Sequence, residues 1–303
     1  MSLEQIPIVY LWVDGSDKEY KKRYSLLVNS RNRDNDDLKY SLRSLETYMP
    51  WWKGKLYIVT DNQRPYWLMD DDNIIMVDHK DIIPEEHLPS FNTHFIHRYL
   101  HNIKGIEDNF LLFDDDFIVN DSVEPEDFIK DGILINKFND RIIYPDKLKD
   151  LNVGSNQWIR SNLWKASVFQ TMNILKEKLD SNFDKYYLNH TPYVLSKKSI
   201  MECNELFKNE LSEKIFKFRD FEFSTVYLYI YYYHITNNIP VKTTNNPYFF
   251  MKLKDDSEFI GLQETIIDKQ FICFNDSFGS NDTSNRLKEL YDRLLPFKSK
   301  YEY

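Results

Sequence analysis

The chain has 303 residues, of which 42% are hydrophobic and 29% are charged, and its formal net charge is −9 at pH 7. This composition is typical of a globular protein with enough chain for one large α/β domain. The acidic balance and the absence of a long basic run argue against nucleic acid as a partner. Two cysteines are too few for a disulfide framework or a zinc cluster, and the 7 glycines form no GxGxxG or Walker A phosphate loop.

The sequence contains neither an apolar stretch long enough to span a bilayer nor the charged start and apolar middle of a signal peptide. With so few cysteines, this predicts a cytoplasmic protein and leaves attachment to the inner face of the cell membrane open. The 21 Tyr and 21 Phe residues suit stacking against sugar rings, but such residues are equally at home in a hydrophobic core.

The first half of the chain alternates apolar runs with amphipathic runs, which predicts the strands and helices of a mostly parallel sheet. Helical spacing predicts a helix after Asp36, which can cap it, and a second helix over 91–103. Each predicted strand ends in polar residues, and open α/β sheets bind ligands beyond the carboxyl ends of their strands. The expected strands are 6–13, 55–60, 73–77 and 110–113.

The second half is predicted to be richer in helix. A hairpin is expected over 133–143, with its turn at Asn139 and Asp140. The segment 221–235 fits either a strand or a helix, and we favour a helix. Since no repeat or linker interrupts the chain, we expect a single catalytic domain over 1–303, with 121–215 as a hairpin and helical insertion. The other expected elements are helices at 157–179 and 196–216 and a strand at 271–274.

Three adjacent carboxylates, Asp114, Asp115 and Asp116, follow the fourth predicted strand and are called here the acidic triplet. Folding does not gather like charges without compensation, and adjacent side chains on a strand point to opposite sides. Carboxylate oxygens are preferred ligands of Mg²⁺ and Mn²⁺, which complete their shells with phosphates and water. A solvated acidic turn is the alternative, but the apolar residues on both sides of the triplet favour a metal site.

A turn of Asp14, Gly15, Ser16 and Asp17 follows the first predicted strand. In a parallel sheet this turn is expected at the same edge as the acidic triplet. It can present backbone N–H groups to a diphosphate or side-chain oxygens to a ribose, and it can equally be no more than a turn.

Three histidines, His94, His97 and His101, lie along the second predicted helix. The spacing of His97 and His101 can chelate zinc, but no third soft ligand accompanies them, which favours polar residues that line a cleft. His190, in a loop before a helix, can take a proton from a hydroxyl group. Arg219, between apolar residues, can stabilise charge on a phosphoryl group.

Several segments resemble the signature regions of the Stealth family. Residues 189–192 (NHTP) with 217–219 (KFR) resemble its third region, and 271–276 (FICFND) resembles the fourth. That family contains bacterial hexose-1-phosphate transferases of capsule and exopolysaccharide synthesis, and the eukaryotic enzyme that starts the mannose-6-phosphate tag. The segments that resemble the first two regions are IPIVYLWVDGSD, RNRDNDDLKYSLRSLETYMPWWKGKLYIVTDNQRPYWL, IIMVDHKDIIP, LPSFNTHFIHRYLHNIKGI and FLLFDDDFIV.

The resemblance implies a Rossmann-like core of the glycosyltransferase A kind, a UDP-hexose donor, and catalytic roles for Asp116, His190 and Arg219. His97 stands where family members usually carry Glu, and Asp114 stands where Asn is usual. If that Glu binds metal or activates the acceptor, His97 must act differently, and it is kept among the candidate catalytic residues. The predicted donor-binding residues are Asp14, Gly15, Ser16, Asp17, Arg33 and Asp36, and the predicted metal ligands are Asp115, Asp116, Asn275 and Asp276.

The sequence therefore predicts a sugar-1-phosphate transferase that depends on Mg²⁺ or Mn²⁺. An acceptor hydroxyl would attack the β-phosphorus of a UDP-sugar, release UMP and form a phosphodiester. The acceptor would be an oligosaccharide or polysaccharide, with a lipid carrier left open. Two alternatives remain. One is a metal-dependent glycosyltransferase that releases UDP. The other is a non-catalytic carbohydrate-binding subunit, and its only support is that His97 replaces the usual Glu.

Overall fold

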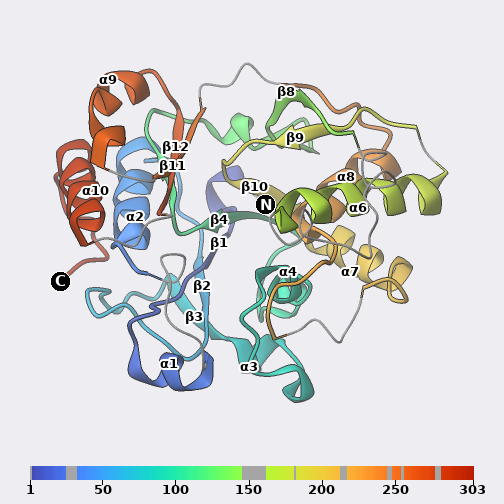
Figure 1. Cartoon of the computed structure of the whole chain (residues 1–303), viewed down its shortest axis with the longest axis horizontal. Coiled ribbons are helices and arrows are strands. Elements are labelled where there is room, and N and C mark those ends of the chain that lie inside the picture. The colour runs from blue at the N-terminus through green and yellow to red at the C-terminus, as the bar shows by residue number, and fades with distance from the viewer. Residues whose placement is uncertain are drawn as a thin grey trace.

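The computed structural model describes residues 2–24, 33–144, 162–180, 182–211, 217–243, 248–253, 256–276 and 281–303. Within these ranges, a sheet of five strands in the order β10-β4-β1-β2-β3 forms the centre (Figure 1). Strands β1 to β4 are parallel to one another, and β10 runs antiparallel beside β4. The strands span Ile8–Leu11 (β1), Leu56–Thr60 (β2), Ile74–Asp78 (β3), Asn109–Asp114 (β4) and Tyr193–Ser196 (β10).

This topology confirms the predicted α/β class with a Rossmann-like, mostly parallel core. The order β3-β2-β1-β4 is that of the first half of a doubly wound sheet. The strands predicted in the first half all form: β1 is two residues shorter at each end than the predicted range 6–13, and the other three lie within one residue of their predicted ranges. Long apolar runs predict them well because a parallel strand is covered on both faces.

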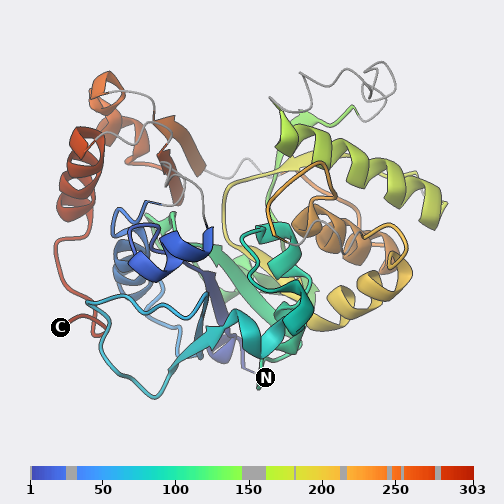
Figure 2. The ribbon, with the colours of Figure 1, turned by 60° about the horizontal axis from the view of Figure 1, so that its bottom comes forward.

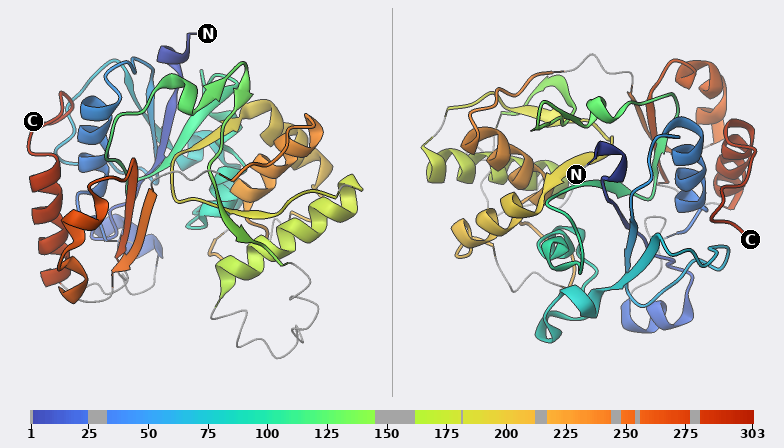
Figure 3. Two further views of the ribbon diagram at one scale, coloured as in Figure 1. Left: turned by 90° about the horizontal axis from the view of Figure 1, so that it is seen from above. Right: turned by 180° about the vertical axis from the view of Figure 1, so that it is seen from behind.

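A smaller sheet has the order β11-β12-β5 and is joined to the central sheet by the chain, because β5 follows β4. Its strands are Phe117–Val119 (β5), Tyr248–Leu253 (β11) and Phe271–Asp276 (β12), and the last confirms the strand predicted at 271–274. β5 follows β4 after a turn formed by Asp115 and Asp116. The views from above and behind show β11 and β12 on the side of helices α2 and α10, away from α6 and α8 (Figure 3).

The two faces of the central sheet pack against different helices. Val9 and Leu112 face one hydrophobic core, to which α6, α7 and α8 contribute, while Ile8 and Leu111 face the other, to which α2 contributes. Figures 1 and 2 show these helices on opposite sides of the sheet. The longer helices span Asp37–Tyr48 (α2), Leu163–Leu179 (α6), Lys197–Leu206 (α7), Thr225–Thr236 (α8) and Asn281–Leu294 (α10).

Short elements complete the described fold. The short α-helices are Lys18–Tyr24 (α1), His79–Ile82 (α3), Thr93–His97 (α4) and Leu262–Ile266 (α9). The 3₁₀ turns are Leu3–Gln5 (η1), Glu85–His87 (η3), Leu100–Asn102 (η4), Pro125–Asp127 (η5) and Asp256–Phe259 (η7). Two strand pairs join Ile129–Lys130 (β6) with Ile133–Leu134 (β7), and Phe138–Ile142 (β8) with Tyr186–Leu188 (β9).

The hairpin predicted over 133–143 is wrong. The turn lies earlier, at Asp131 and Gly132, which both have positive φ and join β6 to β7. Asp-Gly is a favoured sequence for a two-residue hairpin turn, so the turn forms there and not at Asn139-Asp140. β8, which contains Asn139 and Asp140, pairs instead with the distant strand β9.

Two predicted helices are shorter than expected. The helix over 91–103 ends at His97, because Arg98 and Tyr99 bond three residues back and tighten the last turn, and only η4 follows. The helix predicted at 196–216 ends at Leu206, and 212–216 lie outside the described residues, as do 157–161 of the helix predicted at 157–179.

In the segment 221–235 the favoured helix forms as α8, which begins at Thr225, so residues 221–224 precede it. Among the described residues, no helix is both long and apolar enough to cross a membrane. The division of the chain, with 121–215 as an insertion, stays a prediction. β10 lies inside that range and pairs with β4 of the central sheet.

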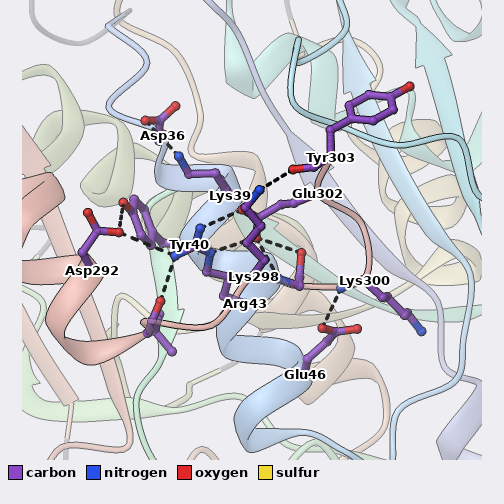
Figure 4. A network of polar contacts seen from close by, with 12 residues as sticks. Asp36, Lys39, Tyr40, Arg43, Glu46, Asp292, Lys298, Lys300, Glu302 and Tyr303 are labelled. Atoms are coloured by element: carbon purple, nitrogen blue, oxygen red, sulfur yellow. Dashed lines mark hydrogen bonds and ion pairs between the residues drawn. The ribbon is translucent and has the colours of Figure 1, made fainter.

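A buried ion pair fixes the C-terminal residues onto α2 (Figure 4). Arg43 Nε donates to Glu302 Oε1 at 2.8 Å, and Arg43 Nη2 donates to Glu302 Oε2 at 2.7 Å. A third hydrogen bond runs from Arg43 Nη1 to the carbonyl of Leu295 at 2.9 Å. Both charged side chains are buried, so neither charge has water as an alternative partner.

We therefore expect Arg43→Ala to lower the free energy of unfolding by about 3 kcal/mol, because Glu302 loses its buried partner. Urea unfolding followed by circular dichroism measures this loss. Lys53→Ala is the control, since Lys53 and Glu4 form an exposed pair, and its effect should stay within about 0.5 kcal/mol. Equal unfolding midpoints for Arg43→Ala and the wild type would contradict the assignment.

Candidate active site

The carboxyl ends of the parallel strands meet at one edge of the central sheet, where ligands of such sheets bind. β10 runs the other way, with Tyr193 opposite Leu112, so the loop 189–192 that precedes it lies at this same edge. The turn at 14–17, the acidic triplet and His190 are therefore all placed at one edge of the sheet.

The smaller sheet brings the end of β12 to the acidic triplet. β5 begins directly after the triplet and pairs antiparallel with β12, with Phe117 opposite Cys273. Asn275 and Asp276 continue β12 past the start of β5, so the backbone places them beside the triplet. Asn275 is half-buried, and the side chain of Asp276 lies outside the described part of the structure.

The carboxyls of the acidic triplet are half-buried and repel one another. Burial raises the pKa of Asp114 to about 6, although the positive charge of Arg219 lowers it in part. Burial and the charge of Asp114 raise the pKa of Asp116 to about 7. Burial and the charge of Asp116 raise the pKa of Asp115 well above its usual value. These carboxylates are therefore costly as charges unless a cation compensates them.

Asp34 and Asp37, which are not among the residues predicted from the sequence, extend this group. Asp37 is the first residue of α2, is buried, and accepts a hydrogen bond from the Tyr291 hydroxyl at 3.3 Å. Burial and then the charges of Asp116 and Asp34 raise the pKa of Asp37 well above its usual value. Burial and the charge of Asp36 raise the pKa of Asp34 to about 6.

The chemistry of this acidic group fits a hard divalent cation. Mg²⁺ and Mn²⁺ prefer carboxylate oxygens, and mutual repulsion of buried carboxylates is what such an ion relieves. Among the described residues, no three His, Cys, Asp or Glu side chains converge closely enough to hold an ion alone. Mg²⁺ usually takes part of its coordination shell from phosphate oxygens and water.

The charge of Arg219 acts both on the acidic triplet and on the histidines of α4. Burial and then the charge of Arg219 lower the pKa of His97 to about 3 and that of His94 well below its usual value. The same guanidinium lowers the pKa of Asp114 and so partly offsets the rise that burial causes. Burial raises the pKa of Glu222 to about 7, and the charge of Arg219 is among the effects that lower it. The charge of Arg219 therefore reaches both His97 and the first residue of the triplet.

The contacts of His97 are those of a neutral, buried imidazole. Its Nδ1 lies 3.2 Å from the Thr225 hydroxyl oxygen, and its Nε2 is buried without a hydrogen-bond partner. α4 ends at His97, while His101 lies in the separate turn η4. The helical spacing on which zinc chelation by these two rings depends is therefore broken between them.

The turn after β1 uses its side chains for its own structure. Asp14 Oδ1 accepts from the Ser16 N–H at 2.7 Å, and Asp17 Oδ1 accepts from an N–H in the first turn of α1 at 2.7 Å. The side-chain amide of Gln63 makes two hydrogen bonds to the backbone of Asp14: its Oε1 accepts from the Asp14 N–H, and its Nε2 donates to the Asp14 carbonyl. Gly15 is buried. A role of this turn in donor binding stays a prediction.

Asp36 occupies the N-cap position of α2, but its side chain makes no capping bond, contrary to the sequence prediction. Its φ of 63° is left-handed, whereas capping side chains reach the helix from an extended backbone. The carboxylate instead pairs with Lys39 at 3.1 Å and Lys288 at 2.9 Å. Burial opposes ionisation, but these two lysines lower the pKa of Asp36 overall. Arg33 lies half-buried three residues before it.

His190 lies at the predicted edge but has different neighbours from Arg219. Its ring stacks on Phe250, with 4.0 Å between the ring centroids, and faces Trp164 at 6.4 Å. Burial and the charge of Arg141 lower the pKa of His190 to about 4. In the part of the chain that the structure describes, no contact joins its side chain to the acidic triplet or to Arg219.

Comparison with known proteins agrees with the signature segments. Residues 31–136 match the model of Stealth protein conserved region 2. The chain is 28% identical over 335 residues to the capsular polysaccharide phosphotransferase WcwK of Streptococcus pneumoniae, covering 99% of this chain and 100% of that protein. It is 32% identical over 212 residues to the capsular polysaccharide phosphotransferase cps12A of Actinobacillus pleuropneumoniae, covering 65% and 54% respectively.

The chain thus spans about half the length of the two Actinobacillus pleuropneumoniae relatives that it matches. Among solved structures, the galactosyltransferase LgtC, in complex with donor and acceptor sugar analogues, aligns over 97% of this chain and 98% of its own, with 14% identity and a TM-score of 0.40. The sequence matches agree with the resemblance: residues 31–136 match Stealth conserved region 2, and the chain is similar to bacterial capsular polysaccharide phosphotransferases.

Proposed function

We propose that this chain transfers hexose-1-phosphate from a UDP-sugar to a carbohydrate hydroxyl in the synthesis of a capsular or exopolysaccharide. It would act in the cytoplasm on an oligosaccharide or polysaccharide, either free or carried on a lipid at the membrane. Phosphotransferases among its relatives support the reaction class. The observation that carries the proposal is that the charge of Arg219 acts on Asp114, at the edge where a sheet of this kind binds its ligand.

The proposed reaction makes one P–O bond and breaks another. The acceptor oxygen attacks the β-phosphorus, and the bond from that phosphorus to the oxygen shared with UMP breaks. UMP leaves with this oxygen and its electron pair, and a phosphodiester remains between hexose and acceptor. The hydroxyl proton passes to His190, which is neutral at pH 7 and so has a free lone pair.

Charge stabilisation carries most of the catalysis of such a transfer. Arg219 presents a planar guanidinium, which suits bidentate binding of the non-bridging phosphate oxygens. A bound Mg²⁺ or Mn²⁺ would supply further neutralisation of the diphosphate. The residues proposed to hold that ion are Asp115, Asp116, Asn275 and Asp276.

The nucleotide product tests this proposal. With a UDP-hexose, Mg²⁺ or Mn²⁺ and a carbohydrate acceptor, we expect UMP on ion-exchange chromatography and a phosphodiester signal in the ³¹P NMR spectrum of the sugar product. Release of UDP with a phosphate-free product would instead show a glycosyltransferase, because attack would then be at the anomeric carbon. If no acceptor-dependent nucleotide is released with any UDP-sugar, a binding subunit is the better description.

A further inference from the structure

A continuous stack of rings surrounds His190. Tyr187 stacks on Trp164 with 5.5 Å between centroids and 27° between planes, and Trp164 faces His190 at 6.4 Å and 29°. His190 stacks on Phe250 at 4.0 Å and 19°, the closest contact of the series. At the other end, the guanidinium of Arg141 lies 5.4 Å from the ring centroid of Tyr187.

The stack joins parts of the fold that are far apart in the sequence. Trp164 is the second residue of α6, His190 precedes β10, and Phe250 belongs to β11 of the smaller sheet. α6 and the smaller sheet lie on opposite sides of the central sheet in Figure 3. The plane of the His190 ring is therefore set by residues from both sides of the molecule.

Phe250 stacks on the face of the His190 ring and Trp164 lies nearly parallel to it, so the ring edge, which carries Nδ1 and Nε2, is what remains for polar contacts. A proton-transferring histidine is commonly oriented by a hydrogen bond from one ring nitrogen to a carboxylate or carbonyl. Within the described residues, neither nitrogen of His190 makes a hydrogen bond, and Asn189 next to it has a buried amide group without a partner. The orientation of the His190 ring therefore depends on packing against other rings and not on a hydrogen bond.

We propose that Trp164 and Phe250 are positioning residues that hold the ring of His190 in one plane, with its nitrogen edge turned to the acceptor hydroxyl. This rests on the proposed function, in which His190 receives the proton. Arg141 is the charged group that faces the stack, and its charge acts with burial to keep the pKa of His190 at about 4. The ring therefore stays neutral, with a lone pair available, at neutral pH.

The first test is a titration of His190 by NMR with ¹³C-labelled histidine, its signal assigned by its loss in His190→Gln. Phe250→Ala exposes one face of the ring to water, so we expect its protonation midpoint to rise from near 4 towards the ordinary value of about 6.5. Phe250→Tyr keeps the ring and should keep the low midpoint. Phe249→Ala, which removes a ring that packs on Phe274 instead, is the matched control and should leave it unchanged.

The second test uses the transfer reaction. Phe250→Ala and Trp164→Ala should lower kcat by about 10- to 100-fold, since a misplaced proton acceptor costs that much, with little change in the KM for the UDP-sugar. Phe250→Tyr should restore kcat, and Phe249→Ala should retain it. An unchanged His190 midpoint in Phe250→Ala, or a shifted midpoint with wild-type kcat, would overturn the proposal. Absence of transfer by the wild type would refute the proposed function alone, because the titration reports on the ring without turnover.

Discussion

Asp116→Asn should abolish transfer, with kcat lowered by about 10³-fold, and yet raise the melting temperature of the metal-free protein at pH 8. Asp116 is half-buried beside other carboxyls, and its pKa is raised to about 7 by burial and the charge of Asp114. A carboxyl whose pKa is raised on folding stabilises the fold while it is protonated, and this contribution is lost as the pH rises through the folded value. At pH 8 the wild type carries the buried charge, while Asn has the same shape without it.

Thermal unfolding in EDTA at pH 5 and pH 8 measures the effect. The melting temperature of Asp116→Asn should exceed that of the wild type by a few degrees at pH 8, and this difference should shrink at pH 5. Added Mg²⁺ should raise the melting temperature of the wild type much more than that of the variant. Asp140→Asn, at an exposed position on β8, is the matched control and should change neither property. A variant that melts below the wild type at pH 8 would show that Asp116 stabilises the empty site.

The acidic triplet could be found from the sequence because it interrupts an apolar run. Strand β4 is buried on both faces, so the residues at its end are the first that can meet solvent or ligand. The same logic located Asn275 and Asp276 at the end of β12 and the turn after β1. Such positions are predictable because a strand end is a local feature.

Asp37 is harder to identify from the sequence than the acidic triplet, because it does not interrupt an apolar run. It lies four residues before Ser41, whose hydroxyl donates to the carbonyl of Phe117 at 2.5 Å, so both share the face of α2 that meets β5. A polar residue on the buried face of a helix start is the pattern that reveals it. Glu222 has no comparable local signal, since only the tertiary fold brings it to Asn92, whose Nδ2 donates to both carboxylate oxygens.

Pairing between distant segments could not be deduced from local patterns. β8 finds its partner β9 more than forty residues later, and β10 joins β4 from inside the segment predicted as an insertion. The signature segments pair His190 with Arg219, but in the structure His190 lies in an aromatic stack, while the charge of Arg219 acts on α4 and on the acidic triplet. Substrate would bridge these two groups.

Arg219→Ala is expected to lower kcat/KM by about 10²-fold or more, because charge-assisted contacts to a transferring phosphoryl group are worth several kcal/mol in a closed site. The KM for the UDP-sugar should rise as well, since the phosphates are bound before transfer begins. Arg219→Lys keeps the charge but loses the planar fork, so its activity should fall between those of the wild type and the alanine variant.

Steady-state kinetics with varied UDP-sugar, and titration calorimetry with UDP, separate binding from turnover. The matched control is Arg64→Ala, since Arg64 pairs with the exposed Asp70 and should leave both measurements unchanged. Loss of Arg219 also removes the charge that, after burial, lowers the pKa of His97, so the His97 NMR signal should titrate at a higher pH in the variant. If Arg219→Ala shifts that signal but keeps its affinity for UDP and its kcat, Arg219 serves the histidines of α4 and not the phosphates, and another cation must carry the transfer.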